Sequence, residues 1–334
     1  GDVRRMLMNM RAINEGGRAL AAYVGVYSLS PLSHNLGWGA MIMTLTGGGE
    51  FIVHDLGRGE SLLGRLIGTG ATFLFGVPTH AIDLLAELRN SGSKDVGRLK
   101  GFRVSGASVP PVVAAGLLQH GITPQSGYGM TEAGSHHYTL PGDDPRAIIE
   151  TSGKACPGYE VEIFSSDDPE KELPPGETGQ IGGRGASLML GYFDDSEAFE
   201  RAFNSSGWFM TGDMGWLDQA GYIHVTGRKK DVIIRGGHNI DPAEIEEALM
   251  ATPGLAPHFQ IELSKPDRMD QMRVLCECVD ATVDDAARQT AAQQLAAQIK
   301  ETVGISVMID VGDVNTITRS EGKAVRIIDN RPKG

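Results

Sequence analysis

The chain has 334 residues, of which 41% are hydrophobic and 22% are charged, and its formal net charge at pH 7 is −12. This length accommodates about two domains, and the acidic balance argues against a nucleic-acid-binding protein, because neutralising phosphates requires a basic face. No apolar run reaches the ~18 residues that a membrane-spanning helix needs, and no signal-peptide pattern is present. The three cysteines, Cys156, Cys276 and Cys278, form no disulfide framework and no four-ligand zinc set. We therefore expect reduced thiols in a cytoplasmic protein.

The first part of the chain predicts an amphipathic helix over residues 5–22 and a buried strand over 24–30. A loop with Pro and Gly follows the strand, and its His34 and Trp38 are typical of a pocket wall. A hydrogen bond of His34 within its own loop is an equally good interpretation. A helix over 39–46 and a strand over 51–54 come next. The three glycines between them are interpreted as a turn, because a phosphate loop would need a following Lys-Ser or Lys-Thr at a helix start.

Alternating helices and strands continue to residue 126. Residues 61–90 predict a helix, a strand and a second helix, and residues 101–105 predict a strand that ends in Gly106-Ala107. Pro110 and Pro111 begin the next helix, as proline does in a first turn. Ligands of open α/β sheets bind where strands end and helices begin. The sequence therefore predicts an α/β domain with a ligand site at this edge.

The strand over 122–126 is predicted to end in a turn that runs from Gly127 through Gly129 to Glu132. Such a turn suits a polyanion with a divalent cation, since the Thr131 hydroxyl and backbone N–H groups can contact phosphate while Glu132 binds Mg²⁺. Taken alone, a purely structural turn is the better interpretation.

The pattern changes to short strands after residue 151, which predicts a small antiparallel or barrel-like subdomain. Expected here are strands over 159–164, 179–183 and 189–192, a helix over 196–203 and a hairpin whose turn is 218–221. Asp213 is placed in a tight turn.

The last hundred residues predict a small α+β domain. A basic cluster, 228–230, leads into a strand over 231–235, a Gly-Gly pair and a helix that Asp241 caps with Glu244 in a capping box. Strands around 258–263 and 272–279 follow, with Cys276 and Cys278 on one face. A long helix is expected to start at Thr282 and end at Gly304, before a strand over 305–311.

Four segments in this order resemble the adenylate-forming superfamily, which includes acyl- and aryl-CoA synthetases, luciferases and peptide-synthetase adenylation domains. The segments are YGMTE (128–132), GWFMTGD (207–213), GRKKDVIIRGGHNIDPAEIE (227–246) and RSEGK (319–323). Residues 127–250 are similar to CoA ligases of medium-chain, alicyclic or aromatic acids, and the ending is similar to phenylacetate-type ligases. The resemblance implies that ATP and a carboxylic acid form acyl-AMP, which then passes its acyl group to CoA.

The resemblance also implies roles for individual residues. Gly106 and Ala107 lie along the adenine, Tyr128 and Gly129 beside it, and Thr131 contacts phosphate while Glu132 binds Mg²⁺. Asp213 accepts both ribose hydroxyls and Arg228 reaches the ribose region. His34, Trp38 and Gly127 line the acyl pocket. Lys323 bridges the substrate carboxylate and the phosphate, although a solvated side chain is the better interpretation of this lysine taken alone.

Domain organisation follows from the same resemblance: a partial large domain over 1–229 and a mobile lid over 230–334, with Lys230 at a hinge within 228–231. Gly236 and Gly237 would line the CoA tunnel when the lid rotates. The family's Ser/Thr/Gly-rich phosphate loop should precede residue 6 and is not in this sequence, so we expect an incomplete chain that adenylates poorly by itself. The alternatives are a module that loads a carrier protein and a non-catalytic nucleotide-binding relative. The oligomeric state stays open.

Overall fold

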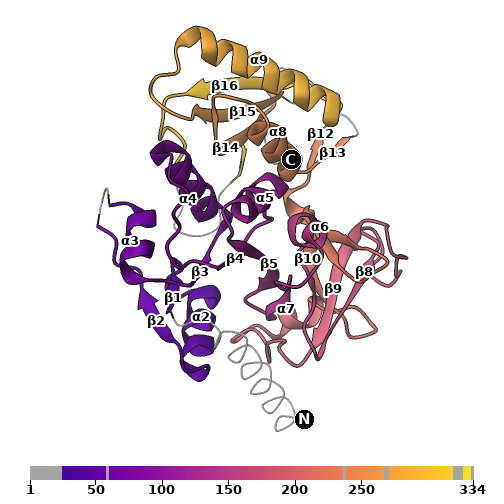
Figure 1. Cartoon of the computed structure of the whole chain (residues 1–334). Coiled ribbons are helices and arrows are strands. Elements are labelled where there is room, and N and C mark those ends of the chain that lie inside the picture. Colours follow the sequence, from indigo (N-terminus) through magenta and orange to yellow (C-terminus); the bar gives the residue numbers. More distant parts are fainter. Residues whose placement is uncertain (1–24, 58–59, 236–237, 267–270, 319–325, 332–334) are drawn as a thin grey trace. The chain divides into compact units, whose positions relative to one another are not determined.

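The computed structural model describes residues 25–57, 60–235, 238–266, 271–318 and 326–331. The chain divides into two compact units, one up to Val225 and the other from Thr226 onward, and Figure 1 colours them in chain order. The helix expected over 5–22 lies outside the described residues.

A seven-stranded sheet forms the centre of the first unit, in the order β2-β1-β3-β4-β5-β6-β7 (Figure 1). The strands are β1 (Gly25–Ser28), β2 (Glu50–Val53), β3 (Phe73–Gly76), β4 (Gly101–Ser105), β5 (Thr123–Met130), β6 (Gly134–Tyr138) and β7 (Lys154–Ala155). Strands β1 to β5 pair in parallel, and β6 and β7 join antiparallel. The connecting helices are α2 (Asn35–Thr46), α3 (Leu62–Thr69), α4 (Pro78–Ser91), α5 (Pro111–Gln119) and α6 (Pro145–Glu150). The predicted α/β class is confirmed.

Helix α2 packs on one face of this sheet, where its Leu36 and Ala40 contact Phe73 and Phe75. Residues paired across parallel strands point to the same face. Phe75 pairs with Arg103, so the Arg103 side chain starts from the face that α2 covers. We call this side of the sheet the α2 face.

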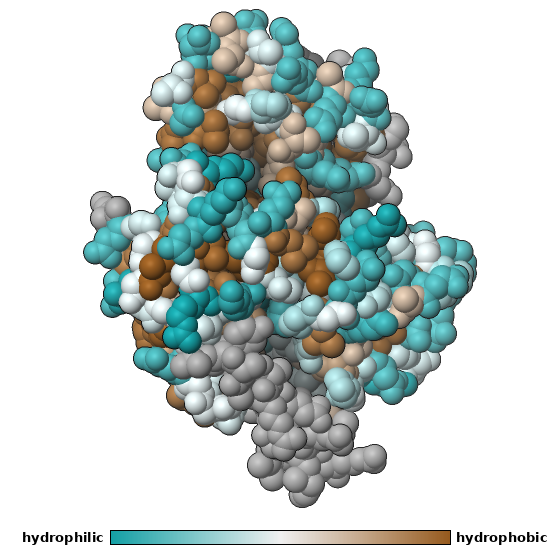
Figure 2. Space-filling view, viewed as in Figure 1, coloured by the Kyte–Doolittle hydropathy of each residue, from teal (hydrophilic) through white to brown (hydrophobic). Residues whose placement is uncertain are grey.

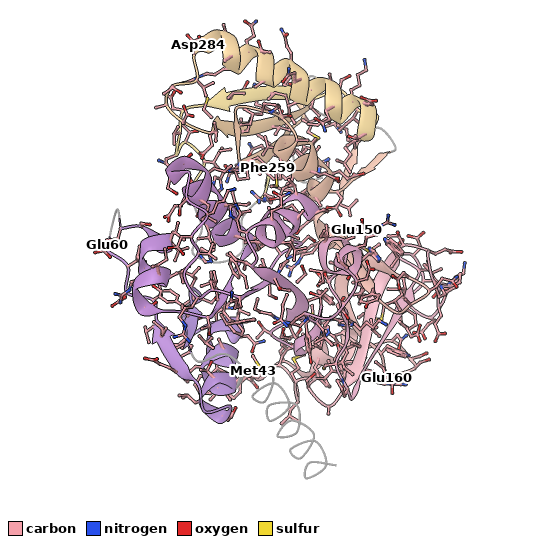
Figure 3. The ribbon with its side chains drawn as sticks, viewed as in Figure 1. Met43, Glu60, Glu150, Glu160, Phe259 and Asp284 are labelled. Atoms are coloured by element: carbon pink, nitrogen blue, oxygen red, sulfur yellow. The ribbon has the colours of Figure 1, made fainter. Side chains whose placement is uncertain are left out.

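A four-stranded sheet, ordered β11-β10-β9-β8, completes the first unit, and its strand β11 runs across the boundary at Val225 into the second unit. Its strands are β8 (Tyr159–Phe164), β9 (Gly179–Gly185), β10 (Phe209–Leu217) and β11 (Ile223–Arg228), with α7 (Ser196–Arg201) between β9 and β10. Figure 3 labels Glu160 on β8 and Glu150 at the end of α6. Tyr128 of β5 packs with Ile163, Ile181 and Ile223 of these strands. The two sheets therefore meet at Tyr128, and the predicted antiparallel subdomain is confirmed.

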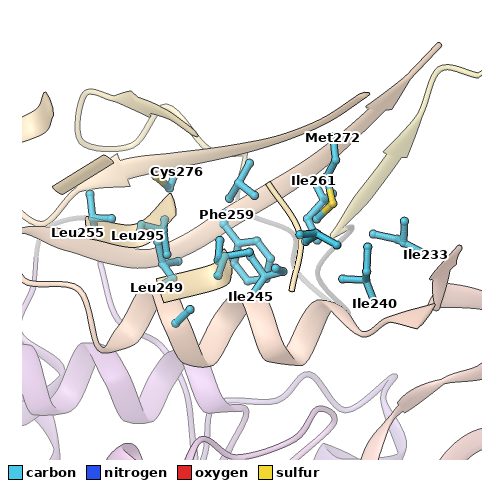
Figure 4. Close-up of a cluster of buried hydrophobic side chains, with 14 of the residues drawn as sticks. Ile233, Ile240, Ile245, Leu249, Leu255, Phe259, Ile261, Met272, Cys276 and Leu295 are labelled. Carbon is cyan, nitrogen blue, oxygen red and sulfur yellow. The ribbon is translucent and has the colours of Figure 1, made fainter. Parts of the chain in front are cut away.

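The second unit is an α+β fold with its own core. Its elements are a 3₁₀ turn (Lys229–Asp231), β12 (Ile233–Arg235), β13 (His238–Ile240), α8 (Pro242–Met250), β14 (Leu255–Ser264), β15 (Gln271–Cys278), α9 (Asp285–Thr302), β16 (Met308–Gly312) and β17 (Ile327–Asp329). Helices α8 and α9 cover a sheet in the order β16-β15-β14-β17, and Figure 4 shows Ile245, Phe259 and Leu295 meeting between them. The capping box at Asp241 and Glu244 is confirmed.

The predicted turn over Gly127–Glu132 is wrong in its extent. Strand β5 continues to Met130, and only residues 131–133 turn before β6. Gly129 faces Ser135 across the hairpin, where an added Cβ would stand 2.3 Å from the carbonyl oxygen of Gly134. Glycine permits this close pairing, so the strand extends where a turn was expected.

The structure also corrects the expected position of Asp213. The residue lies within β10, at a shift of register against β9 between Met210 and Met214. Gly212 beside it has a φ of +74°. Irregularities of this kind re-aim side chains at the point in the strand where they occur.

Smaller differences concern element ends. Residues 189–192 form a loop rather than a strand, with Leu190 79% exposed. Asp284, labelled in Figure 3, caps α9 in place of Thr282, because its carboxylate accepts from the Ala287 N–H while Thr282 bonds to Asp280. Helix α2 starts four residues earlier than expected, at Asn35.

Candidate nucleotide and acyl site

A buried hydrogen bond joins the two sheets of the first unit. The Tyr128 hydroxyl on β5 donates to Oδ2 of Asp213 on β10 over 3.0 Å, and Asp213 is 6% exposed. Burial, and then the neighbouring carboxylate, raise the pKa of Tyr128 well above its ordinary value. Tyr128 therefore stays a neutral donor to one oxygen of the Asp213 carboxylate.

Local backbone contacts fix the position of Asp213. Its N–H donates to Thr211 Oγ1 over 3.1 Å, and the Thr211 hydroxyl donates to the carbonyl of Ile181 on β9 over 2.8 Å. The irregular part of β10 is thereby tied to the neighbouring strand. A carboxylate held in this way is a preorganised acceptor for a pair of hydroxyl groups.

The loop after β4 carries Gly106 and Ala107, as the sequence predicts. Gly106 has a φ of +99°, a conformation that favours glycine. The Ser105 hydroxyl donates to the Gly127 carbonyl over 3.0 Å, and the Ser108 hydroxyl donates to the Val225 carbonyl on β11 over 3.3 Å. The loop is therefore connected to β5 and to the small sheet, the two elements that hold Tyr128 and Asp213.

Glu132 follows Thr131 in the turn after β5 and is partly buried. Its Oε1 accepts from the Tyr192 hydroxyl over 3.2 Å, and its backbone carbonyl accepts from the Met189 N–H over 2.6 Å. The loop after β9 thus holds both the main chain and the side chain of Glu132. Tyr192 was not selected from the sequence, because a contact across 60 residues leaves no local pattern.

His34 caps α2, and the interpretation of this residue as hydrogen-bonded within its own segment is confirmed. Its Nδ1 accepts from the Leu36 N–H over 3.1 Å, which is the hydrogen bond within its own segment. The residue also stands where the chain leaves the carboxyl edge of β1, at the start of the α2 face. Trp38 lies in the first turn of α2 and is 52% exposed.

A buried polar cluster lies on β4 and β6. Arg103 is 7% exposed, and its Nη2 donates to Ser135 Oγ over 2.6 Å and to the His137 carbonyl over 3.4 Å. The Nδ1 atoms of His136 and His137 are 2.6 Å apart, so one donates and the other accepts. Their Nε2 atoms have no hydrogen-bond partner in the described part of the chain. The two adjacent histidines were not selected from the sequence, since buried histidines carry no periodic signal.

Burial keeps the imidazoles of His136 and His137 neutral, and it does the same for His80 on α4. It lowers the pKa of His137 to about 3 and that of His80 to about 4, and it lowers the pKa of His136 well below its usual 6.5. In the unfolded chain each would bind a proton near pH 6.5. The folded state therefore binds fewer protons than the unfolded state between about pH 3 and 6.5, and stability is lost as the pH falls through this window.

We expect the free energy of unfolding of the first unit to fall between pH 7 and pH 4.5, by up to about 1.4 kcal/mol per pH unit for each of these histidines. All three tryptophans lie in this unit, so urea titrations followed by tryptophan fluorescence measure it. Replacing His137 with Gln should flatten the pH dependence, whereas the control His120→Gln on the half-buried C-terminus of α5 should not. An identical slope in both variants would contradict the assignment.

The remaining predicted residues belong to the second unit. Arg228 ends β11 and Lys230 lies in the following 3₁₀ turn. Gly236, Gly237 and Lys323 lie outside the described residues. Among the described residues no group of three or more His, Cys, Asp or Glu side chains is placed to hold a metal. None of the described helices combines the length and apolar composition that crossing a bilayer requires.

The chain matches the family described as AMP-binding enzyme over residues 3–193 and the AMP-binding enzyme C-terminal domain over residues 237–331. It therefore belongs to the AMP-binding enzymes, and the resemblance to adenylate-forming enzymes is confirmed.

Curated relatives include a medium-chain fatty-acid–CoA ligase of Escherichia coli, 37% identical over 227 residues, which are 67% of this chain and 39% of the relative. A feruloyl-CoA synthase of Amycolatopsis is 35% identical over 68% of this chain and 45% of its own length. The chain thus spans about two fifths of these relatives. ATP-bound MatB from Rhodopseudomonas palustris has a TM-score of 0.74 at 25% identity, covering 94% of this chain and 62% of that one. An anthranilate CoA ligase in complex with anthranoyl-AMP has a TM-score of 0.78 at 20% identity, with the same coverages.

Proposed function

We propose that the protein is an AMP-forming acyl-CoA synthetase that activates a carboxylic acid with ATP and transfers the acyl group to CoA. The observation that carries the proposal is the buried Tyr128–Asp213 pair, which stands beside the Gly106 loop where β4 and β5 end. A buried carboxylate can accept hydrogen bonds from the two ribose hydroxyls. Backbone at the carboxyl ends of parallel strands, beside an aromatic ring, can border the base. The combination suits a nucleotide. The names of the curated relatives, both CoA–acid ligases, support the same reaction class.

The reaction has two halves. A carboxylate oxygen of the acid attacks the α-phosphorus of ATP, which forms the acyl–AMP bond and expels pyrophosphate. The sulfur of CoA then attacks the acyl carbon, forming a thioester and breaking the bond to AMP, while the thiol proton passes to solvent. In the proposal Asp213 holds the ribose, Tyr128 and Gly129 border the adenine with Gly106 and Ala107, and Thr131 contacts phosphate.

Glu132 is a suitable ligand for Mg²⁺. Magnesium in nucleotide sites is commonly bound by one or two carboxylates together with substrate phosphates and water, and Glu132 offers a partly buried carboxylate beside the exposed Thr131. The Tyr192 hydroxyl occupies only its Oε1. When bound, the ion neutralises phosphate charge, and the chain's own contribution is to hold the Glu132 carboxylate in place.

Replacing Tyr192 with Phe is expected to raise the Mg²⁺ concentration needed for half-maximal activity by about three- to ten-fold, because a hydrogen bond to a charged group is lost. Mg²⁺ titrations of ATP–pyrophosphate exchange measure this, and the KM for the acid should stay unchanged. Tyr222→Phe, in the β10–β11 hairpin, is the matched control. An unchanged Mg²⁺ requirement in the Tyr192 variant would show that Tyr192 does not position Glu132.

Residues 230–334, which make up most of the second unit, are proposed to be a mobile lid. Lys230 is the proposed hinge, because rotation about a few residues at a domain junction exchanges two arrangements. Arg228 would reach the ribose region. Lys323 would join the site for adenylation, and Gly236 and Gly237 would line the CoA tunnel for thioester formation. Three cysteines without a disulfide framework suit a reducing compartment, so a cytoplasmic location is part of the proposal.

The proposal is tested with the full natural protein that contains this chain. ATP–pyrophosphate exchange that depends on a carboxylic acid, followed by consumption of free CoA, is the expected result. Exchange without consumption of CoA would instead indicate a module that loads a carrier protein. Binding of AMP without exchange for any acid would indicate a non-catalytic nucleotide-binding relative and would overturn the proposal.

A further inference from the structure

Arg103 is a buried cation without a carboxylate partner among the described residues. Its hydrogen bonds come from Nη2 alone and go to a hydroxyl and a backbone carbonyl, both uncharged. Its guanidinium lies 4.9 Å from the centre of the Tyr138 ring. Burial lowers the pKa of Arg103 to about 10, and the only groups that counter this effect are the weakly acidic Tyr138 and Cys156. A buried charge of this kind is costly unless a partner of opposite charge completes it.

The guanidinium lies directly against Gly127. A Cβ on Gly127 would stand 2.6 Å from Cζ and Nη2 of Arg103, so any larger residue at this position would displace the guanidinium. Gly127 is the residue of β5 that the family resemblance of the sequence implies for the acyl pocket. The Arg103 guanidinium therefore covers the position on the sheet surface that a side chain at residue 127 would otherwise occupy.

Strand register places this cation on the α2 face. Phe75 and Arg103 are paired residues of β3 and β4, and Phe75 packs against α2. The proposed acyl-pocket residues His34 and Trp38 also belong to the start of α2. Helix α2 further comes close to β6, which carries Ser135. The acyl-pocket residues and the unpaired guanidinium thus share one side of the sheet.

We propose that Arg103 determines substrate specificity by binding a second carboxylate at the far end of the acid, so that the preferred substrates are dicarboxylic acids. This inference rests on the proposed function. A guanidinium pairs with a carboxylate through two parallel hydrogen bonds, and Nε and Nη1 donate no hydrogen bond to the described residues. An acid with an apolar end would leave the cation unpaired, which selects against it.

The test compares acids that differ only at the far end: suberate against octanoate, and terephthalate against p-toluate. In ATP–pyrophosphate exchange with the full natural protein, we expect kcat/KM for the better diacid to exceed that of its partner by about ten-fold or more. Arg103→Met, which keeps the length and removes the charge, should reverse this preference. Arg103→Lys should retain part of it, and Arg201→Met on the exposed helix α7 should leave it unchanged.

The outcomes separate three explanations. Exchange only with the apolar-ended acids in the wild-type protein overturns the specificity inference and leaves the proposed function intact. Exchange with no acid overturns the proposed function itself. A loss for all acids in equal proportion in Arg103→Met, with a lower melting temperature, assigns Arg103 a purely structural role. The comparison of acids in the wild-type protein decides the question even where a variant fails to fold.

Discussion

Replacing Asp213 with Ala is expected to weaken binding of AMP by about 100-fold, because two hydrogen bonds from ribose to a buried carboxylate are lost. The substitution also leaves the Tyr128 hydroxyl without its acceptor in a buried position, which should lower the free energy of unfolding by about 1–3 kcal/mol. Titration calorimetry with AMP and urea unfolding measure the two effects separately.

Two variants control this experiment. Asp167→Ala removes an exposed carboxylate from the same unit and should change neither quantity. Tyr128→Phe removes one hydrogen bond but keeps the carboxylate, so its effect on AMP binding should stay below that of Asp213→Ala. Unchanged affinity for AMP in the folded Asp213 variant would show that the nucleotide binds elsewhere.

Replacing Lys323 with Ala should separate the two halves of the reaction. We expect formation of acyl-AMP to fall by about 100-fold or more, since a fixed cation is lost where charge develops on phosphate. Transfer to CoA from supplied acyl-AMP should stay within about three-fold of the wild-type rate, because this half is proposed to use Gly236 and Gly237 instead. Pyrophosphate release and thioester formation are the two measurements.

Lys300→Ala, on the exposed side of α9, is the matched control and should leave both rates unchanged. If the rates of acyl-AMP formation and of thioester formation both fell to the same extent in Lys323→Ala, the lysine would act in both half-reactions. The proposal that Lys323 serves adenylation while Gly236 and Gly237 serve thioester formation would then be wrong.

In Figure 2 the visible face is largely hydrophilic and neutral in hydropathy, with apolar residues in smaller areas among them. Single exposed apolar residues are ordinary on protein surfaces. The Tyr128–Asp213 pair and Arg103, on which the proposals rest, are instead buried polar groups, which the hydropathy of a surface does not reveal.

The sequence by itself determined the class of the fold, the order of its elements and the family. Short apolar runs such as those of β1 and β3 identify strands buried on both faces. The capping box at Asp241 is a local pattern and fixes the start of α8. Ordered motifs indicated the family because each depends only on residues that are adjacent along the chain.

Only the tertiary structure decided which distant side chains meet. The Tyr128–Asp213 bond spans 85 residues, and the contact of Arg103 with Gly127 depends on the register between β4 and β5. A shift of one residue in register turns every side chain of a strand to the other face. The register shift at Asp213, the contact of Tyr192 with Glu132 and the lack of a carboxylate partner for Arg103 among the described residues all depend on residues far apart in the chain, which no local pattern encodes.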